Sequence, residues 1–175
     1  MNWKELWLND TNFKSRFKIL DSYLKDKPNL ILDIGCGFAY VPGFFQEKYG
    51  TKLWLLDGNP NNNSRQIEYG PVNDFDFYYN TDEIKEQLNS RNLNYTFVDA
   101  ANIDIDESIK FDLITSFASC GAHYPAETYK DLILKHSHKD TKIVLDIRKK
   151  TNQNINIVNV IEKTRKSDMC EIKFR

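Results

Sequence analysis

Residues 30–49 constrain the fold of this chain more than any other part of its sequence. Residues 30–34 form a run that is apolar except for one aspartate and has no polar alternation, which is typical of a strand covered on both faces. Gly35 and Gly37 follow at once, and glycine allows both a sharp turn and the close approach of a ligand to the backbone. Residues 41–49 are compatible with a helix, so the sequence predicts a strand, a glycine turn and a helix.

The glycine turn differs from that of a dinucleotide-binding site. That fingerprint has Gly or Ala at its sixth position, where a small residue lets the helix pack closely on the strand, and this chain has Tyr40 there. An acidic residue, Asp33, lies two residues before the first glycine. A carboxylate at that tip is poorly placed beside a pyrophosphate, and it suits a ligand that carries positive charge.

The pattern Asp33-x-Gly35-x-Gly37-x-Ala39 resembles motif I of the class I S-adenosylmethionine-dependent methyltransferases, with Ala39 where the family usually has its third glycine. S-adenosylmethionine carries an ammonium and a sulfonium group, which agrees with the acidic residue. The resemblance covers roughly residues 29–175. It implies an α/β fold: a Rossmann-like, mostly parallel seven-stranded sheet with a C-terminal antiparallel hairpin and helices on both faces. The alternative is that residues 33–39 form a structural turn in another kind of α/β protein.

The remaining apolar runs predict the other strands. Continuous apolar runs that alternate with helical segments indicate parallel strands, and they lie at residues 53–56, 95–98, 111–117 and 143–147. The run that begins at Phe111 resembles motif IV of the same family. Residues 157–161 and 169–174 predict a terminal antiparallel hairpin, with a helix over residues 153–163 as the alternative.

A chain of 175 residues is long enough for one domain but not comfortably for two, so we interpret residues 1–175 as a single methyltransferase-like domain. Residues 1–26 predict two amphipathic helices that break near residues 9–11. Residues 58–94 are longer than a simple crossover needs and predict an insertion between the second and third strands. Its aromatic segment, residues 75–79, either shapes a substrate pocket or packs in the core.

Composition excludes several classes of function. The formal net charge is −1, so we expect neither nucleic acid nor a membrane surface as a partner. No apolar run approaches the ~20 residues of a membrane span, and the first residues do not resemble a signal peptide. The three cysteines are far apart, without a Cys-x-x-Cys pair, so we expect a cytoplasmic protein without disulfides or a zinc site. The carboxylates of residues 104–107 are interpreted as a solvated loop rather than a metal site.

Strand ends and the resemblance together predict a site for S-adenosylmethionine. Asp57 ends the second predicted strand, where a carboxylate can accept hydrogen bonds from both ribose hydroxyls of an adenosine. The resemblance implies that Asp99, at the end of the third strand, accepts the adenine amino group. The predicted cofactor-binding residues are Asp33, Gly35, Cys36, Gly37, Asp57, Gly58, Asp99, Ala100 and Ser116.

The turn after the fourth strand, residues 118–125, is predicted to carry the chemistry. A neutral His123 imidazole could take a proton from a substrate hydroxyl, although His123 could instead pack against the following helix. Ser119 and Tyr124 are predicted to bind the substrate. Cys120 as a nucleophile is a further alternative, although it lacks the preceding proline of cytosine-C5 enzymes.

Two other histidines, His136 and His138, lie near a predicted helix end, and we expect them to be solvated rather than to bind metal.

We therefore expect an S-adenosylmethionine-dependent methyltransferase that acts on a small hydroxylated substrate such as a sugar. A non-catalytic module that binds S-adenosylmethionine or a nucleotide is the alternative. The Asn/Asp-Pro-Pro-aromatic motif of amino-methylating branches is absent, which disfavours DNA-adenine methylation.

Overall fold

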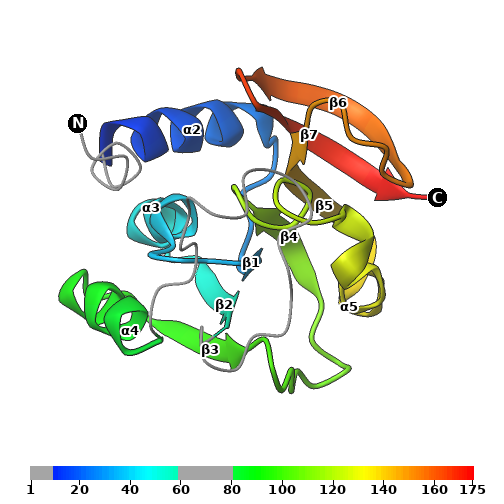
Figure 1. Ribbon diagram of the computed structural model, residues 1–175. Helices are drawn as coiled ribbons and strands as arrows, with labels where there is room; N and C mark the ends of the chain where they lie inside the picture. Colours follow the sequence, from blue (N-terminus) through cyan, green and yellow to red (C-terminus); the bar gives the residue numbers. More distant parts are fainter. Residues whose placement is uncertain (1–9, 59–80) are drawn as a thin grey trace.

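The computed structural model describes residues 10–58 and 81–175, and in these ranges it contains one seven-stranded sheet (Figure 1). The strand order is β3-β2-β1-β4-β5-β7-β6. Neighbouring strands from β3 to β5 are parallel, whereas β7 runs antiparallel to both β5 and β6. The strands are β1 (Leu30–Ile34), β2 (Lys52–Asp57), β3 (Tyr95–Asp99), β4 (Phe111–Ser116), β5 (Ser137–Arg148), β6 (Ile155–Lys163) and β7 (Ser167–Phe174). The predicted parallel sheet and C-terminal hairpin are confirmed, and the alternative helix over residues 153–163 is wrong.

Five helical segments accompany the sheet in the described ranges: α2 (Asp10–Tyr23), α3 (Tyr40–Tyr49), α4 (Thr81–Ser90), the 3-10 helix η2 (Ala126–Tyr129) and α5 (Lys130–Lys135). Gly50 ends α3 with a φ of 71°, and its N–H donates to Gln46 O, as the glycine at that position predicts. Ile84 and Leu88 form the buried apolar face of α4. Part of the predicted insertion, including residues 75–79, and the first predicted helix lie outside the described residues.

Apolar side chains of the strands alternate between two buried clusters. Ile31 of β1 packs in a cluster with residues of α2, α3 and α4, whereas its neighbour Leu32 packs in a cluster with Ile133 of α5. This alternation is the period-2 geometry of a strand with both faces covered. Figure 1 agrees, because α3 and α5 lie on opposite sides of the sheet.

Two predictions near β5 require correction. The strand begins at Ser137 rather than near residue 143. The prediction was too short because residues 137–142 are mostly polar and do not form an apolar run, although Ser137 pairs with Phe111 of β4. His136, expected to be solvated, is only 1% exposed, and its Nδ1 lies 2.9 Å from Ile109 O. The early start of β5 draws His136 into the core beside the Phe111 ring.

None of the helices in residues 10–58 and 81–175 is both long and apolar enough to cross a membrane.

Candidate active site

The glycine turn after β1 rests on the end of β2. The backbone N–H groups of Gly35 and Cys36 both donate to Leu56 O, at 2.8 and 3.1 Å. Gly35 and Gly37 have φ values of 68° and 48°, and Ala39 has 47°. Ala39 thus adopts the left-handed conformation that glycine favours, at the position where the resembled family usually has its third glycine.

Gly35 also brings the turn after β1 against the turn after β4. A Cβ built on Gly35 would lie 2.0 Å from Ser119 Oγ, far closer than any real contact. Glycine at position 35 is therefore required both by its φ and by the approach of Ser119. The carboxyl ends of β1 and β4 meet here, as expected for neighbouring parallel strands.

Asp57 holds the glycine turn in place. Its Oδ2 accepts a hydrogen bond from Gly37 N at 2.7 Å, and its Oδ1 accepts one from Gly58 N at 2.8 Å. Burial raises the pKa of Asp57 to about 6, although these two backbone donors favour the ionised form. A carboxylate oxygen accepts more than one hydrogen bond, so Asp57 keeps acceptor capacity for a ligand.

Asp33 lies inside the sheet rather than at an open surface. It is 3% exposed, and its Oδ1 accepts a hydrogen bond from Thr115 Oγ1 of β4 at 2.6 Å. Burial, with a smaller contribution from the charge of Asp57, raises the pKa of Asp33 to about 7. The Asp33 carboxyl group therefore takes up a proton at a higher pH than an exposed aspartate does.

The remaining predicted cofactor residues divide between surface and interior. Asp99 is exposed and lies opposite Asp57 in the β2–β3 register. Ala100 follows it, and its N–H donates to Asp57 O at 2.9 Å. Cys36 is buried, which raises the pKa of its thiol well above the usual range. Ser116 is fully buried, and its Oγ donates to Ile34 O at 2.7 Å, so it joins β4 to β1.

The turn after β4 brings together two of the residues predicted to meet the substrate. Ser119 Oγ and Tyr124 Oη lie 2.6 Å apart. His123 is half-buried, and its backbone N–H donates to Ser119 O at 2.8 Å. Cys120 is fully buried, which contradicts an accessible nucleophile at this position.

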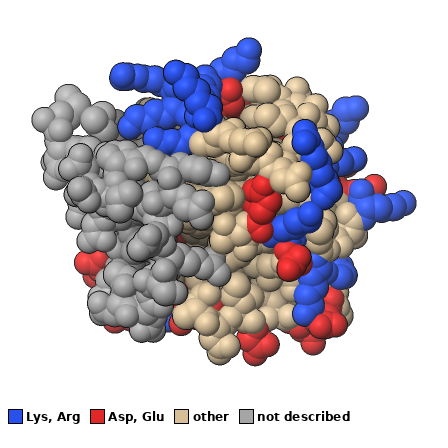
Figure 2. Space-filling view, turned by 45° about the vertical axis from the view of Figure 1, so that its right-hand side comes forward, with Lys and Arg blue, Asp and Glu red and all other residues tan. Residues whose placement is uncertain are grey.

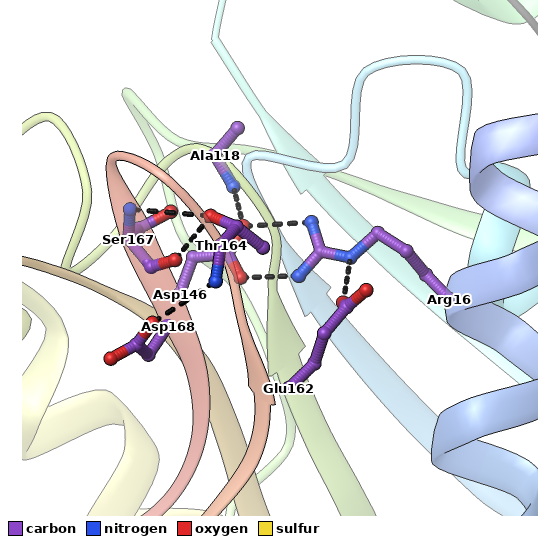
Figure 3. Close-up of polar contacts among 7 residues, drawn as sticks. All are labelled: Arg16, Ala118, Asp146, Glu162, Thr164, Ser167 and Asp168. Atoms are coloured by element: carbon purple, nitrogen blue, oxygen red, sulfur yellow. Dashed lines mark hydrogen bonds and ion pairs between the residues drawn. The ribbon is translucent and has the colours of Figure 1, made fainter.

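A buried ion pair that was not predicted from the sequence also holds this turn (Figure 3). Asp146 of β5 accepts a hydrogen bond from Ala118 N at 2.8 Å and bonds both terminal nitrogens of Arg16, which reaches in from α2. The Arg16 guanidinium also lies 4.7 Å over the Phe117 ring. One signal was available, because an aspartate inside the apolar run 143–147 needs a partner.

Arg91 is another residue near the site that was not predicted from the sequence. It follows α4, and its Nη1 donates to Phe38 O at 3.0 Å beside the glycine turn. Its guanidinium lies 5.0 Å over the Tyr40 ring. A Cβ on Gly43 would lie 2.4 Å from Arg91 Nη2, so the glycine inside α3 makes room for this arginine.

No protein-family model matches the sequence, and no curated protein matches it. Solved structures do match. A methyltransferase from Pyrococcus furiosus superposes with a TM-score of 0.60 at 16% identity, over 93% of this chain and 82% of that chain. The fold is shared with methyltransferases of known structure.

Two further solved structures superpose on this chain. A protein from Pyrococcus horikoshii OT3 gives a TM-score of 0.61 at 14% identity, over 95% of this chain and 93% of the other. The plantazolicin methyltransferase BpumL, in complex with SAH and a pentazolic desmethylPZN analog, gives 0.57 at 17% identity. That superposition covers 83% of this chain and 50% of BpumL. At these identities the likeness concerns the fold.

Proposed function

We propose that this protein is an S-adenosylmethionine-dependent methyltransferase that acts on a hydroxyl group of a small substrate such as a sugar. The observation that carries the proposal is the close approach of Ser119 to Gly35, because it joins the glycine turn to the turn that holds the candidate base. The shared fold supports it, and BpumL contains SAH, which remains when S-adenosylmethionine has given up its methyl group.

The residues around the glycine turn fit this cofactor. The backbone of Gly35 and Gly37 is partly exposed, and Asp57 and Asp99 are paired in register at the ends of β2 and β3. Gly58 and Ala100 complete the same edge, and Asp33 acts from inside the sheet. Bound S-adenosylmethionine would supply an electrophilic methyl group.

The turn after β4 would act on the substrate. We assign the role of general base to His123, which would accept the proton of the substrate hydroxyl. The neighbouring Ser119 and Tyr124 hydroxyls can both donate and accept hydrogen bonds, so they suit the orientation of a hydroxylated substrate. A positioned base typically contributes about 10²–10⁴-fold to the rate.

The test combines cofactor binding with methyl transfer. Calorimetry should show binding of S-adenosylmethionine, and a screen of sugars and small alcohols with labelled cofactor should identify an acceptor. His123→Asn should then bind the cofactor as the wild type does and lose about 10²–10⁴-fold in turnover. His138→Asn is the matched control, because His138 is exposed near the start of β5.

Each contrary outcome has a definite meaning. Full turnover in His123→Asn would show that the proton leaves by another route. Cofactor binding without transfer to any acceptor would favour the non-catalytic binding module. A protein that does not bind S-adenosylmethionine would contradict the proposal as a whole.

A further inference from the structure

The candidate site lies at the edge of the sheet where the parallel strands end. Acidic residues lie on one half of this edge, and basic residues lie on the other half. Asp57 and Asp99 end β2 and β3, on one side of the glycine turn. On the other side, residues 148–168 contain six Lys or Arg residues and only two acidic residues. This concentration is local, because the formal net charge of the whole chain is −1.

The six basic residues lie at the ends of β5 and β6 and on the two adjacent turns that follow them. Since β7 is antiparallel to β5 and β6, the turn between β6 and β7 lies beside the carboxyl end of β5. Lys149 ties the turns together, because its N–H donates to Lys166 O at 3.0 Å and its Nζ to Thr164 O at 2.5 Å. We call the group the basic cluster: Arg148, Lys149, Lys150, Lys163, Arg165 and Lys166.

Figure 2 shows Lys and Arg side chains gathered at the top of the molecule. The turn between β6 and β7 lies at the same height in Figure 1, and a rotation about the vertical axis preserves that height.

The acidic residues of this region are already engaged. Asp168 lies 3.1 Å from Lys149 Nζ, and Glu162 lies 3.4 Å from Arg16. Within the part of the chain that the structure describes, no carboxylate forms an ion pair with four members of the cluster, Arg148, Lys150, Lys163 and Arg165. Their charge is therefore available to an anion.

Arg148 links the basic cluster to the turn after β4. Its backbone N–H donates to Gly121 O at 3.0 Å, and its Nη1 donates to Ala122 O at 3.5 Å. Ala122 is adjacent to His123, the candidate base. The guanidinium has five N–H donors in a planar fork that matches phosphate and carboxylate groups.

We infer that the acceptor substrate is a small anion, which carries a phosphate or carboxylate group beside the hydroxyl to be methylated. The basic cluster, with Arg148 nearest to the turn after β4, binds that group. The acidic half of the edge is then left for the positively charged cofactor. The inference rests on the proposed function and names the substrate class for the same site.

Anion binding can be tested without methyl transfer. The probes are pyrophosphate and citrate, titrated separately onto isotope-labelled protein and followed by amide chemical shifts. Shifts should concentrate at residues 119–123 and 148–150 and weaken with added salt. Arg148→Gln should lower the affinity at least about tenfold, the usual scale for a charged hydrogen bond. The control Lys139→Gln changes a side chain that is 90% exposed at the opposite end of β5 and should have no effect.

The two probes distinguish a phosphate group from a carboxylate group, and binding of either supports the inference. Shifts that avoid both segments, or an equal loss of affinity in Lys139→Gln, would overturn it. Tighter binding of a short RNA than of pyrophosphate would also overturn it, in favour of a nucleic-acid partner. If the anions bind at these residues while S-adenosylmethionine does not bind, the proposed function fails and the anion site remains.

Discussion

Gly35 and Gly50 have nearly the same φ values, 68° and 71°, but very different surroundings. A Cβ on Gly50 would meet nothing within 4 Å, whereas one on Gly35 would overlap Ser119. The comparison distinguishes two reasons why a position requires glycine: a positive φ, and a neighbouring atom that is too close for a Cβ. Gly35, in the candidate site, has both reasons, whereas Gly50 has only the positive φ.

Gly50→Ala should therefore cost about 1 kcal/mol of the free energy of unfolding, the scale of a left-handed alanine. Gly35→Ala should cost about 2–4 kcal/mol, because overpacking against Ser119 adds to the same strain. Denaturant unfolding of both variants measures the difference. The double variant Gly35→Ala/Ser119→Gly should recover part of the loss, and equal costs in the two single variants would contradict the contact.

At the scale of elements, the apolar runs located the strands because buried parallel strands need continuous apolar sequence. The amino-terminal half of β5 was not predicted, because its side chains are polar and partly exposed. Its backbone pairing with β4 does not require an apolar run in the sequence. The glycine turn and the position of Asp57 at the end of β2 were predicted from local sequence, because each directly follows or ends an apolar run. The Arg16–Asp146 pair was not, because its residues are 130 positions apart and only the folded chain joins them.

This ion pair should determine how firmly α2 holds the turn after β4. Its side chains are 14% and 3% exposed, so Arg16→Met would leave the Asp146 charge buried with only Ala118 N–H as a donor. Removal of one partner of a buried pair typically costs about 3–5 kcal/mol. The double variant Arg16→Met/Asp146→Asn should lose much less than the sum of the single variants, because its amide oxygen still accepts from Ala118.

Lys48→Met is the matched control for this cycle. Lys48 lies 2.7 Å from Asp21, but its side chain is 51% exposed. Exposed pairs contribute about 0–1 kcal/mol, so chemical denaturation should detect little change. Additive losses in the Arg16 and Asp146 variants would show that the two side chains are not coupled.

At the scale of the whole molecule, the buried carboxyl groups connect the candidate site to global stability. The pKa values of Asp33 and Asp57, at about 7 and about 6, both lie above the value of 3.8 for an exposed aspartate. The folded state therefore binds more protons than the unfolded state between pH 4 and pH 7. Since stability falls with pH wherever the folded state binds more protons, the cofactor-free protein should lose stability across this window. The pKa of Asp21 is lowered to about 2, so this residue affects the pH dependence of stability only below pH 4.

Asp33→Asn isolates this effect, because an amide resembles the protonated acid and its oxygen can still accept from Thr115. Relative to wild type, the variant should gain up to about 4 kcal/mol in its free energy of unfolding between pH 4 and pH 8. Thr115→Val should act in the opposite direction. The Thr115 hydroxyl lowers the pKa of Asp33, so its loss should extend the decline in stability to higher pH. Urea unfolding at a series of pH values measures both variants, and a constant difference between Asp33→Asn and wild type would show that Asp33 is ionised in the folded protein throughout this range.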